Sequence, residues 1–246
     1  MEVNLRGIKK IVAIGSGKGG VGKSTVTINL ACAMARAGHK VGILDADIYG
    51  PSLPIMFDIH DKPGFEEGQM IPHEKQNIKL MSIGFMMGGE TPLIWRGPMI
   101  QKALQQLLFN TNWGELDYLF IDMPPGTGDI QLTLAQKVPL SGAIIVSTPQ
   151  DIALIDAKKA VHMFNKVNVP ILGLIENMSY FNCPHCHENT YIFDHENVKK
   201  YAQDNSIKFL GEIPLKISIR ENMDQGTPGK IEDVVQKIFD DMVINI

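Results

Sequence analysis

Short runs of branched apolar residues recur along the chain, separated by longer stretches in which apolar and polar positions follow a helical period. Apolar runs of strand length are typical of a parallel sheet buried on both faces, and the intervening stretches are typical of covering helices. The runs that predict strands are 11–14, 40–45, 78–83, 118–122, 143–147, 171–175 and 209–213. The stretches that predict helices are 26–37, 100–109, 151–166 and 231–243. We therefore expect an α/β fold with a doubly wound, mostly parallel sheet flanked by helices.

Turn-forming and polar residues mark the breaks in this pattern. Gly38 is expected to end the first helix, and Asp151 is expected to cap the third. The segment 57–77 is polar and contains Gly and Pro, so it predicts an excursion from the core, and 84–89 predicts a mobile loop. With 246 residues, 44% of them apolar, the chain is long enough for one large domain, and it shows no internal repeat and no convincing linker. We expect a single domain over residues 1–246.

A glycine-rich segment follows the first predicted strand and opens the first predicted helix. Residues 17–25 fit the phosphate-loop pattern G-x-x-x-x-G-K-[ST], in which backbone amides converge on phosphate oxygens. Lys23 is expected to reach the β- and γ-phosphates, Ser24 to ligate Mg²⁺, and the helix N-terminus to favour the anion. The residues expected to contact the nucleotide are Gly17, Gly19, Gly20, Val21, Gly22, Lys23, Ser24 and Thr25. A chance glycine-rich turn is the alternative, and the order of strand, loop and helix argues against it.

Aspartates follow two of the predicted strands, at the edge of the sheet where ligands bind in doubly wound folds. Asp122 ends an apolar strand and has the form of the Walker-B carboxylate that holds Mg²⁺ through water. Asp47 is expected to orient the attacking water, Asp45 to support the hydration shell of the metal, and Gly126 to offer its backbone N–H to the γ-phosphate. A turn or helix-cap aspartate is the bland alternative for each carboxylate, and for Asp45 the two interpretations are evenly matched.

The loop carries a second lysine, Lys18, directly after its first glycine. Phosphoryl transfer is catalysed largely by charge placed against the developing negative charge, but Lys18 is poorly placed to reach the far side of its own nucleotide. The sequence G-K-G-G-V-G-K-S-T resembles the loops of the deviant Walker A ATPases, which include MinD, ParA, the nitrogenase iron protein and the Mrp/ApbC group. The resemblance implies a P-loop NTPase in which Lys18 crosses a dimer interface to the partner's ATP and acts in catalysis with Lys23 and Asp47. A solvated surface lysine is the alternative.

Further motifs narrow the resemblance to one group. They are 45–52 (D-A-D-I-Y-G-P-S), 95–98 (W-R-G-P), 122–129 (D-M-P-P-G-T-G-D), 176–179 (E-N-M-S) and 183–186 (C-P-H-C). Together, over about residues 8–214, they resemble the Mrp/ApbC family, cytosolic ATPases that bind iron–sulfur clusters and transfer them to apoproteins. The resemblance also implies adenine recognition by Asn177 and by the segment around Pro214. Many relatives carry an additional N-terminal domain or cysteine motif, so any cluster here is expected to depend on the single C-x-x-C pair.

Cys183 and Cys186 supply two thiolates, whereas a [4Fe–4S] cluster or a structural Zn²⁺ commonly takes four ligands. A two-fold homodimer supplies four from two identical pairs, and a lysine that acts in trans requires the same assembly. The hypothesis is therefore a cluster that bridges two subunits. Two alternatives remain. One is a Zn²⁺ site completed by His185 or His187, and Zn²⁺ is also expected to occupy the cluster thiolates in aerobically isolated protein. The other is a redox dithiol.

Charge and composition argue against several classes of partner. The net charge of −4 disfavours a general nucleic-acid binder, and no window reaches the roughly 18 uncharged apolar residues that a membrane span needs. Residues 1–4 lack the basic-then-apolar order of a secretory signal, and the three cysteines suit a metal or redox site better than a disulfide framework, so a cytoplasmic location is expected. The acidic residues of 231–242 disfavour MinD-like membrane attachment, and ParA-like DNA binding would require a basic stripe. Cys32 is expected to be a small buried residue of the first helix.

Overall fold

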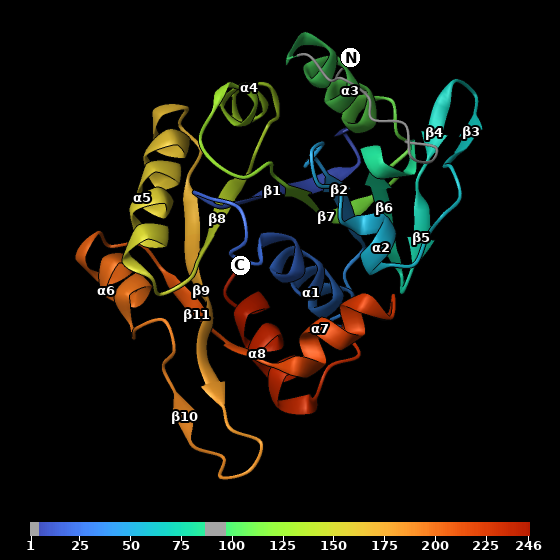
Figure 1. The fold of residues 1–246 in the computed structure, drawn as a ribbon. Helices are drawn as coiled ribbons and strands as arrows, with labels where there is room; N and C mark the ends of the chain where they lie inside the picture. The colour runs from blue at the N-terminus through green and yellow to red at the C-terminus, as the bar shows by residue number, and fades with distance from the viewer. Residues whose placement is uncertain (1–4, 87–96) are drawn as a thin grey trace.

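Residues 5–86 and 97–246 are described by a computed structural model, in which strands and helices alternate along most of the chain (Figure 1). The strands are β1 (Ile8–Gly15), β2 (Val41–Asp45), β3 (Gly64–Glu66), β4 (Gln69–Ile71), β5 (His73–Lys75), β6 (Ile78–Ser82), β7 (Leu116–Asp122), β8 (Gly142–Ser147), β9 (Ile171–Asn182), β10 (Asn189–Thr190) and β11 (Phe209–Leu215). The helices are α1 (Lys23–Arg36), α2 (Leu53–Met56), α3 (Gly97–Phe109), α4 (Asp129–Lys137), α5 (Asp151–Lys166), α6 (Asn197–Asp204), α7 (Ile217–Asp224) and α8 (Asp233–Val243), with a 3₁₀ turn η2 (Ile83–Phe85).

One sheet organises the molecule. Its order is β10-β9-β8-β1-β7-β2-β6-β5, with β11 pairing along β9. The pairs among β9, β8, β1, β7, β2 and β6 are parallel, as is β11 with β9, while β5 and β10 run antiparallel to their neighbours. β3 and β4 form a separate antiparallel hairpin. The expectation of a doubly wound, mostly parallel sheet is confirmed, because the apolar runs form its central strands.

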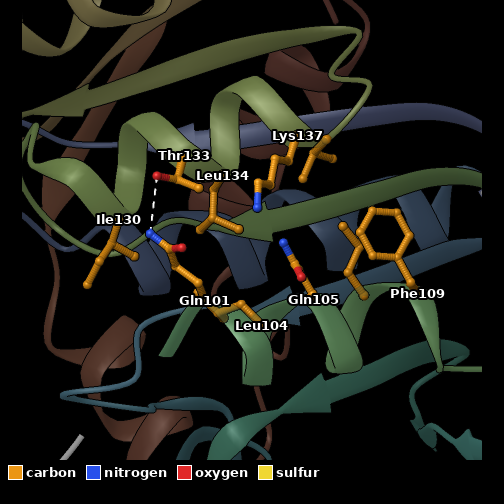
Figure 2. Close-up of a pocket in the computed structure, with 10 residues that line it drawn as sticks. Gln101, Leu104, Gln105, Phe109, Ile130, Thr133, Leu134 and Lys137 are labelled. Carbon is orange, nitrogen blue, oxygen red and sulfur yellow. Dashed lines mark hydrogen bonds between the residues drawn. The ribbon is translucent and has the colours of Figure 1, made fainter. Parts of the chain in front are cut away.

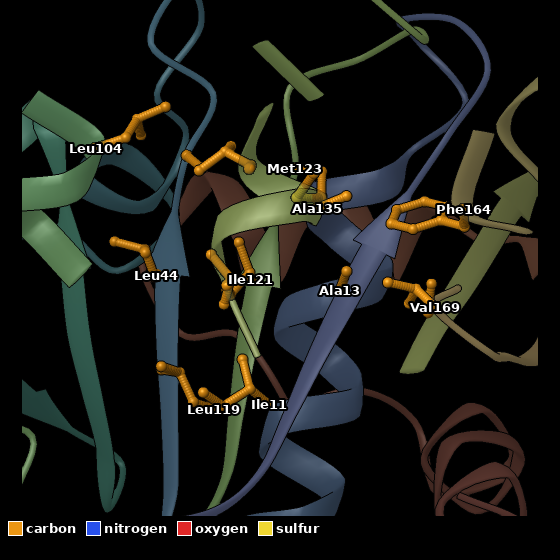
Figure 3. Close-up of a cluster of buried hydrophobic side chains, with 14 of the residues drawn as sticks. Ile11, Ala13, Leu44, Leu104, Leu119, Ile121, Met123, Ala135, Phe164 and Val169 are labelled. Carbon is orange, nitrogen blue, oxygen red and sulfur yellow. The ribbon is translucent and has the colours of Figure 1, made fainter. Parts of the chain in front are cut away.

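Helices cover both faces of the sheet. The helices α3, α4, α5 and α6 bury apolar side chains against one face, and α3 lies beside α4 with a hydrogen bond of 3.4 Å from Gln101 Nε2 to Thr133 Oγ1 (Figure 2). The helices α1, α7 and α8 cover the other face. Because successive strand residues point to opposite faces, Ala13 of β1 enters the first cluster and Val12 the second. Figure 3 shows strand residues such as Ala13 in the first cluster, together with Phe164 of α5.

Two element boundaries differ from the expectations. The strand expected at 171–175 continues to Asn182, because its second half pairs with β11 and its end pairs with β10. Buried polar residues in that half hide its strand character from an apolar pattern. Asp151 is the first residue of α5 rather than its cap, and Gln150 holds the cap position without a side-chain hydrogen bond.

The expectation that 57–77 is only an excursion from the core is wrong in part. Phe57 is fully buried and Met70 is buried, and β5 adds an antiparallel strand to the edge of the main sheet. The helices α2, α4, α6 and α7 were not expected, because they are short and mix polar with apolar residues. The residues 95–96 of the W-R-G-P motif and part of the expected loop 84–89 lie outside the described residues. None of the helices within the described ranges combines the length and apolar character needed to cross a bilayer.

Candidate functional site

The phosphate-loop residues form a tight turn between β1 and α1. A Cβ at Gly17 would overlap the carbonyl group of Asp156 in α5, so only glycine fits where the two backbones meet. Gly22 directly precedes the first residue of α1 and has φ of 81°. This φ lies in the left-handed region, which favours glycine. The expected nucleotide-contacting residues all lie in this turn and the first turn of α1: Gly17, Gly19, Gly20, Val21, Gly22, Lys23, Ser24 and Thr25.

Asp122, at the end of β7, is the centre of a buried polar cluster. Lys23 Nζ donates to Asp122 Oδ1 at 2.6 Å, and Ser24 Oγ donates to Oδ2 at 2.5 Å. Thr27 Oγ1 also donates to Oδ1 at 3.0 Å. Lys23 and Asp122 are 6% and 2% exposed, so neither charge is solvated and each depends on the other. Hydroxyl and carboxylate oxygens are the donors that Mg²⁺ prefers, so Ser24 and Asp122 fit the expected magnesium site. The sequence interpretation missed Thr27, although it lies one helical turn after Lys23.

Asp45, at the end of β2, is fully buried beside Asp122. Its Oδ1 accepts the Asp47 N–H at 3.0 Å, and its Oδ2 accepts the Ser52 N–H at 2.9 Å and the Ser82 hydroxyl at 3.1 Å. Burial, and next the charge of Asp122, raise the pKa of Asp45 to about 7. The carboxylate thus anchors the loop that follows β2, which is the turn-aspartate role, and its support of a metal's hydration shell stays a prediction.

Asp47 lies in that loop and is half-buried. Its Oδ1 accepts the Gly50 N–H at 3.3 Å. Burial raises the pKa of Asp47, while the nearby charge of Lys23 acts in the opposite direction. A carboxylate with a raised pKa accepts a proton more readily, which suits the expected role beside an attacking water.

Lys18 and Gly126 differ in how firmly they are held. The Lys18 ammonium forms no hydrogen bond or ion pair with any described residue, whereas its carbonyl accepts the Ser16 hydroxyl at 2.9 Å. The loop therefore fixes the Lys18 backbone and leaves its side chain uncommitted. The Gly126 N–H donates to the Ser16 carbonyl at 3.0 Å. Its expected donation to a γ-phosphate therefore requires this bond to open.

The two residues expected to recognise adenine lie together beside the phosphate loop. Asn177 of β9 is buried, and its Nδ2 donates to the Val21 carbonyl at 2.8 Å. A Cβ at Gly22 would overlap the same Asn177 amide. Pro214 follows Ile213 on β11, and Ile213 pairs with Asn177. The pairing of β11 with β9 therefore brings Pro214 near Asn177 in the sheet, and recognition of adenine by these two residues stays a prediction.

The C-x-x-C pair lies in the turn between β9 and β10, in a hairpin that projects from the body of the molecule (Figure 1). Cys183 is partly buried and Cys186 is exposed, and both are free thiols. Backbone N–H groups of Cys186 and His185 bond to the Cys183 sulfur and lower the pKa of that thiol. The turn therefore carries both cysteines at the end of the hairpin, and the thiolate is the form in which cysteine binds metals.

The two cysteines are not part of a larger group of metal-binding side chains in the described part of the chain. Among the described residues, no group of three or more His, Cys, Asp or Glu side chains is arranged to hold a metal ion. The Zn²⁺ site completed by His185 or His187 stays an alternative. The pair remains two ligands short of the usual four.

Two cavities among the described residues lie away from the phosphate loop. The space between α3 and α4 measures about 10 Å³, which holds at most a single water (Figure 2). A larger apolar groove of about 670 Å³ lies between the β3–β4 hairpin and α3 and is lined by residues such as Phe65, Met70 and Met99. Neither space contains a residue of the phosphate loop or of the cysteine hairpin.

One mostly parallel sheet carries a phosphate loop, buried aspartates beside it and a separate thiol hairpin. A comparison with known protein families agrees with this combination. The family model of the ParA type described as NUBPL iron-transfer P-loop NTPase matches residues 7–246. The chain belongs to this family. Membership confirms the resemblance inferred from the loop and the later motifs, and it confirms the P-loop NTPase fold.

Known proteins from several organisms are similar to most of this chain. The iron-sulfur cluster transfer protein NUBPL of Dictyostelium discoideum is 54% identical over 230 residues, which cover 92% of this chain and 71% of that protein. The iron-sulfur cluster carrier protein of Aquifex aeolicus is 54% identical over 225 residues, which cover 90% of this chain and 62% of that protein. The chain thus spans less than two thirds of the Aquifex protein. A solved structure of a nucleotide-binding protein from Archaeoglobus fulgidus in complex with ADP has a TM-score of 0.82 at 40% identity, covering 92% and 90% of the two chains.

Proposed function

We propose that this chain is an ATPase that carries iron–sulfur clusters. It binds and hydrolyses ATP with Mg²⁺, and two copies hold a [4Fe–4S] cluster between them for transfer to apoproteins. The observation that carries the proposal is a projecting hairpin with two free thiols, on a fold that also holds a phosphate loop. Among the described residues these thiols belong to no arranged group of three or more metal-binding side chains. The printed names of the Dictyostelium and Aquifex relatives support the same cargo.

The nucleotide occupies the edge of the sheet at the phosphate loop. The amides of 17–25 cradle the phosphates, and Gly126 adds an N–H once its bond to the loop opens. Lys23 exchanges its bond with Asp122 for the β- and γ-phosphates, which replaces one buried anion with another. Asn177 and Pro214 flank the adenine ring.

Hydrolysis depends on charge and orientation around the γ-phosphate. Asp47 orients the water whose oxygen attacks the phosphorus, while the bond to the ADP oxygen breaks. Ser24 and Asp122, supported by Asp45, would hold Mg²⁺, which would supply positive charge beside the phosphate oxygens. Lys18 of the opposite copy supplies positive charge from the far side of the nucleotide. Its uncommitted ammonium supports this role, because it has no hydrogen bond or ion pair to a described residue of its own chain that would have to break.

The cluster is cargo held by four thiolates, two from each copy. Cys183 and Cys186 are presented together at the tip of a hairpin, where a second hairpin can approach. A homodimer satisfies the ligand number of the cluster and the lysine in trans with one assembly. The proposed partners are a second copy of the chain and acceptor apoproteins, with no nucleic acid and no membrane. All three cysteines are free thiols, which supports the cytoplasmic location expected from the sequence.

Anaerobic reconstitution with iron and sulfide tests the proposal. The parent should take up about four iron and four sulfide per dimer, as expected for one Cys₄-held [4Fe–4S] cluster, and the iron should elute with the dimer in size exclusion. Cys183→Ser or Cys186→Ser should abolish stable cluster binding, because each dimer loses two thiolates at once. ADP binding should survive, because the hairpin shares no residue with the phosphate loop.

Cys32→Ala is the matched control, because Cys32 is a free thiol buried in α1, remote in the fold from the hairpin. It should keep the cluster. One full cluster on each monomer, or normal iron loading in a hairpin serine variant, would contradict the bridged dimer. Two zinc ions per dimer, each bound within one chain, would favour the zinc alternative.

A further inference from the structure

One asparagine closes the hairpin that carries the thiols. Asn182, the last residue of β9, donates through Nδ2 to the His187 carbonyl at 2.8 Å and to Asn189 Oδ1 at 3.0 Å. Both acceptors follow Cys186 in the sequence, whereas Asn182 precedes Cys183, so this single amide connects the two sides of the C-x-x-C pair. The backbone adds two bonds inside the turn, from the Cys183 N–H to the Glu188 carbonyl at 3.0 Å and from the His187 N–H to the Cys183 carbonyl at 2.9 Å.

A cation fixes the other end of this amide. Lys216 Nζ lies 3.5 Å from Asn182 Oδ1 and 3.6 Å from the Glu232 carboxylate. An ammonium only donates, so the amide oxygen faces Lys216 and the amide nitrogen faces the two acceptors. The pairing of Leu215 with Phe181 between β11 and β9 brings Lys216 to the base of the hairpin. Lys216 thereby connects the hairpin to the residue that precedes α8.

The position of the cysteine sulfurs depends on the shape of this turn. The backbone bonds between Cys183 and Glu188 and between His187 and Cys183 exist only while the chain curls back on itself. We infer that Asn182 is a positioning residue for the metal thiolates, whose amide holds the 183–188 turn in the shape that aims both sulfurs at one metal. The inference rests on the proposed function, since it gives the cysteine pair the role of metal ligands. Groups that orient metal ligands in this way typically contribute about 10–100-fold to metal affinity.

Anaerobic titration of the full chain with Co²⁺ tests the inference, because Co²⁺ bound to thiolates shows charge-transfer and ligand-field bands. Asn182→Asp keeps the size of the side chain and the acceptor for Lys216 but removes both amide hydrogens. We expect the dissociation constant for Co²⁺ to rise about 10–100-fold and the charge-transfer band to weaken at a given Co²⁺ concentration. The new carboxylate by itself favours a cation, so weaker binding reports lost geometry rather than lost charge.

Asn205→Asp is the matched control, because the Asn205 amide also donates to a backbone carbonyl, that of Tyr201 at 2.8 Å, at the end of α6. It should titrate like the parent, and ADP affinity should be unchanged in both variants. Lys216→Met provides a second variant that removes only the orienting cation, with a smaller loss of Co²⁺ affinity expected. Parent-like Co²⁺ binding in Asn182→Asp and Lys216→Met would overturn the positioning role. If the parent itself showed no thiolate band, the proposed function would fail instead.

Discussion

The carboxylates of three buried acidic residues each accept hydrogen bonds from specific donors. Asp122 has Lys23 and two hydroxyls, and Asp45 has backbone N–H groups and Ser82. Glu176 of β9 is 1% exposed, and its Oε2 accepts the Val198 N–H at 3.1 Å, in the first turn of α6. Such groups cost free energy to bury unless they are paired, so each marks a place where the fold requires one particular arrangement.

Glu176→Gln should reveal the cost of ionising this residue. Burial raises the pKa of Glu176, and the charges of Glu212 and Glu196 act in the same direction. The hydrogen bond from the Val198 N–H and the charge of His195 oppose this rise. Between the ordinary value of 4.5 and the raised one, the folded chain keeps a proton that the unfolded chain has lost, so stability falls as pH rises. Gln keeps the size and the acceptor for Val198 but does not ionise. The free energy of unfolding of the variant should therefore gain on that of the parent as pH increases.

Urea denaturation at a series of pH values from about 4.5 upward measures this difference. Glu115→Gln serves as the control, because the Glu115 side chain is 84% exposed. Its curve should run parallel to that of the parent. Parallel curves for Glu176→Gln as well would show that the carboxylate is not penalised by burial.

At the scale of elements, β9 joins the two sites. Its residue Asn177 contacts the phosphate loop, and Cys183 follows its last residue directly. Between them Met178 has φ of 56°, and the register against β11 shifts over the same stretch. A non-glycine residue in the left-handed region of a strand is uncommon and marks a bulge that the surroundings impose. The strand is therefore continuous in sequence but bent between the nucleotide side and the hairpin.

The C-terminal helix α8 packs a few buried side chains into the apolar cluster that also contains α1. Phe239 is fully buried in the cluster with α1, whereas Val234 on the same helix is 72% exposed. Phe239→Ala should lower the free energy of unfolding by about 3–5 kcal/mol, because it removes a buried ring and leaves a cavity. Val234→Ala should change it by less than about 0.5 kcal/mol. Urea denaturation of both variants provides the measurement, and equal effects would show that α8 does not pack as described.

For the whole molecule, two separate features point to a second copy. The hairpin carries two thiols where four are usual, and the Lys18 ammonium has no partner among the described residues. These features lie in different parts of the fold, so one pairing of chains has to satisfy both. An arrangement that brings the phosphate loops together without the hairpins would leave the cluster proposal unsupported.

Mixing two inactive variants tests whether Lys18 acts in trans. Lys18→Ala and Asp47→Asn should each hydrolyse ATP slowly on their own, because one lacks the opposing charge and the other lacks the water-orienting carboxylate. A mixed dimer contains one site with an intact Asp47 and an intact Lys18 from the opposite chain. If subunits exchange at random, an equal mixture should recover about a quarter of the parent's ATPase activity.

Recovery would be absent if Lys18 served its own nucleotide, since both sites of the mixed dimer would then be defective. Each variant measured alone at the same total concentration is the control. Full activity in Lys18→Ala alone would reduce this residue to a surface lysine.

The sequence by itself determined the features that depend on neighbouring residues. Apolar runs mark the central strands because a parallel sheet is buried on both faces, and the spacing of glycines and Lys23 marks the phosphate loop. The aspartates could also be found from the sequence, because each lies at or just after the end of a predicted strand and the carboxyl ends of parallel strands meet at one edge of the sheet. The C-x-x-C pair was also visible, because its two ligands are three residues apart.

Only the tertiary structure decided which distant residues meet. Asp122 lies 98 positions from Ser24 and Asn177 lies 156 positions from Val21, and both contacts depend on the order of strands in the sheet. The same holds for Asp45, whose carboxylate accepts the hydroxyl of Ser82, 37 positions away at the end of β6. Lys216 approaches Asn182 only because β11 pairs with β9. Local periodicity reports whether a residue is buried, whereas strand order and register select its partner.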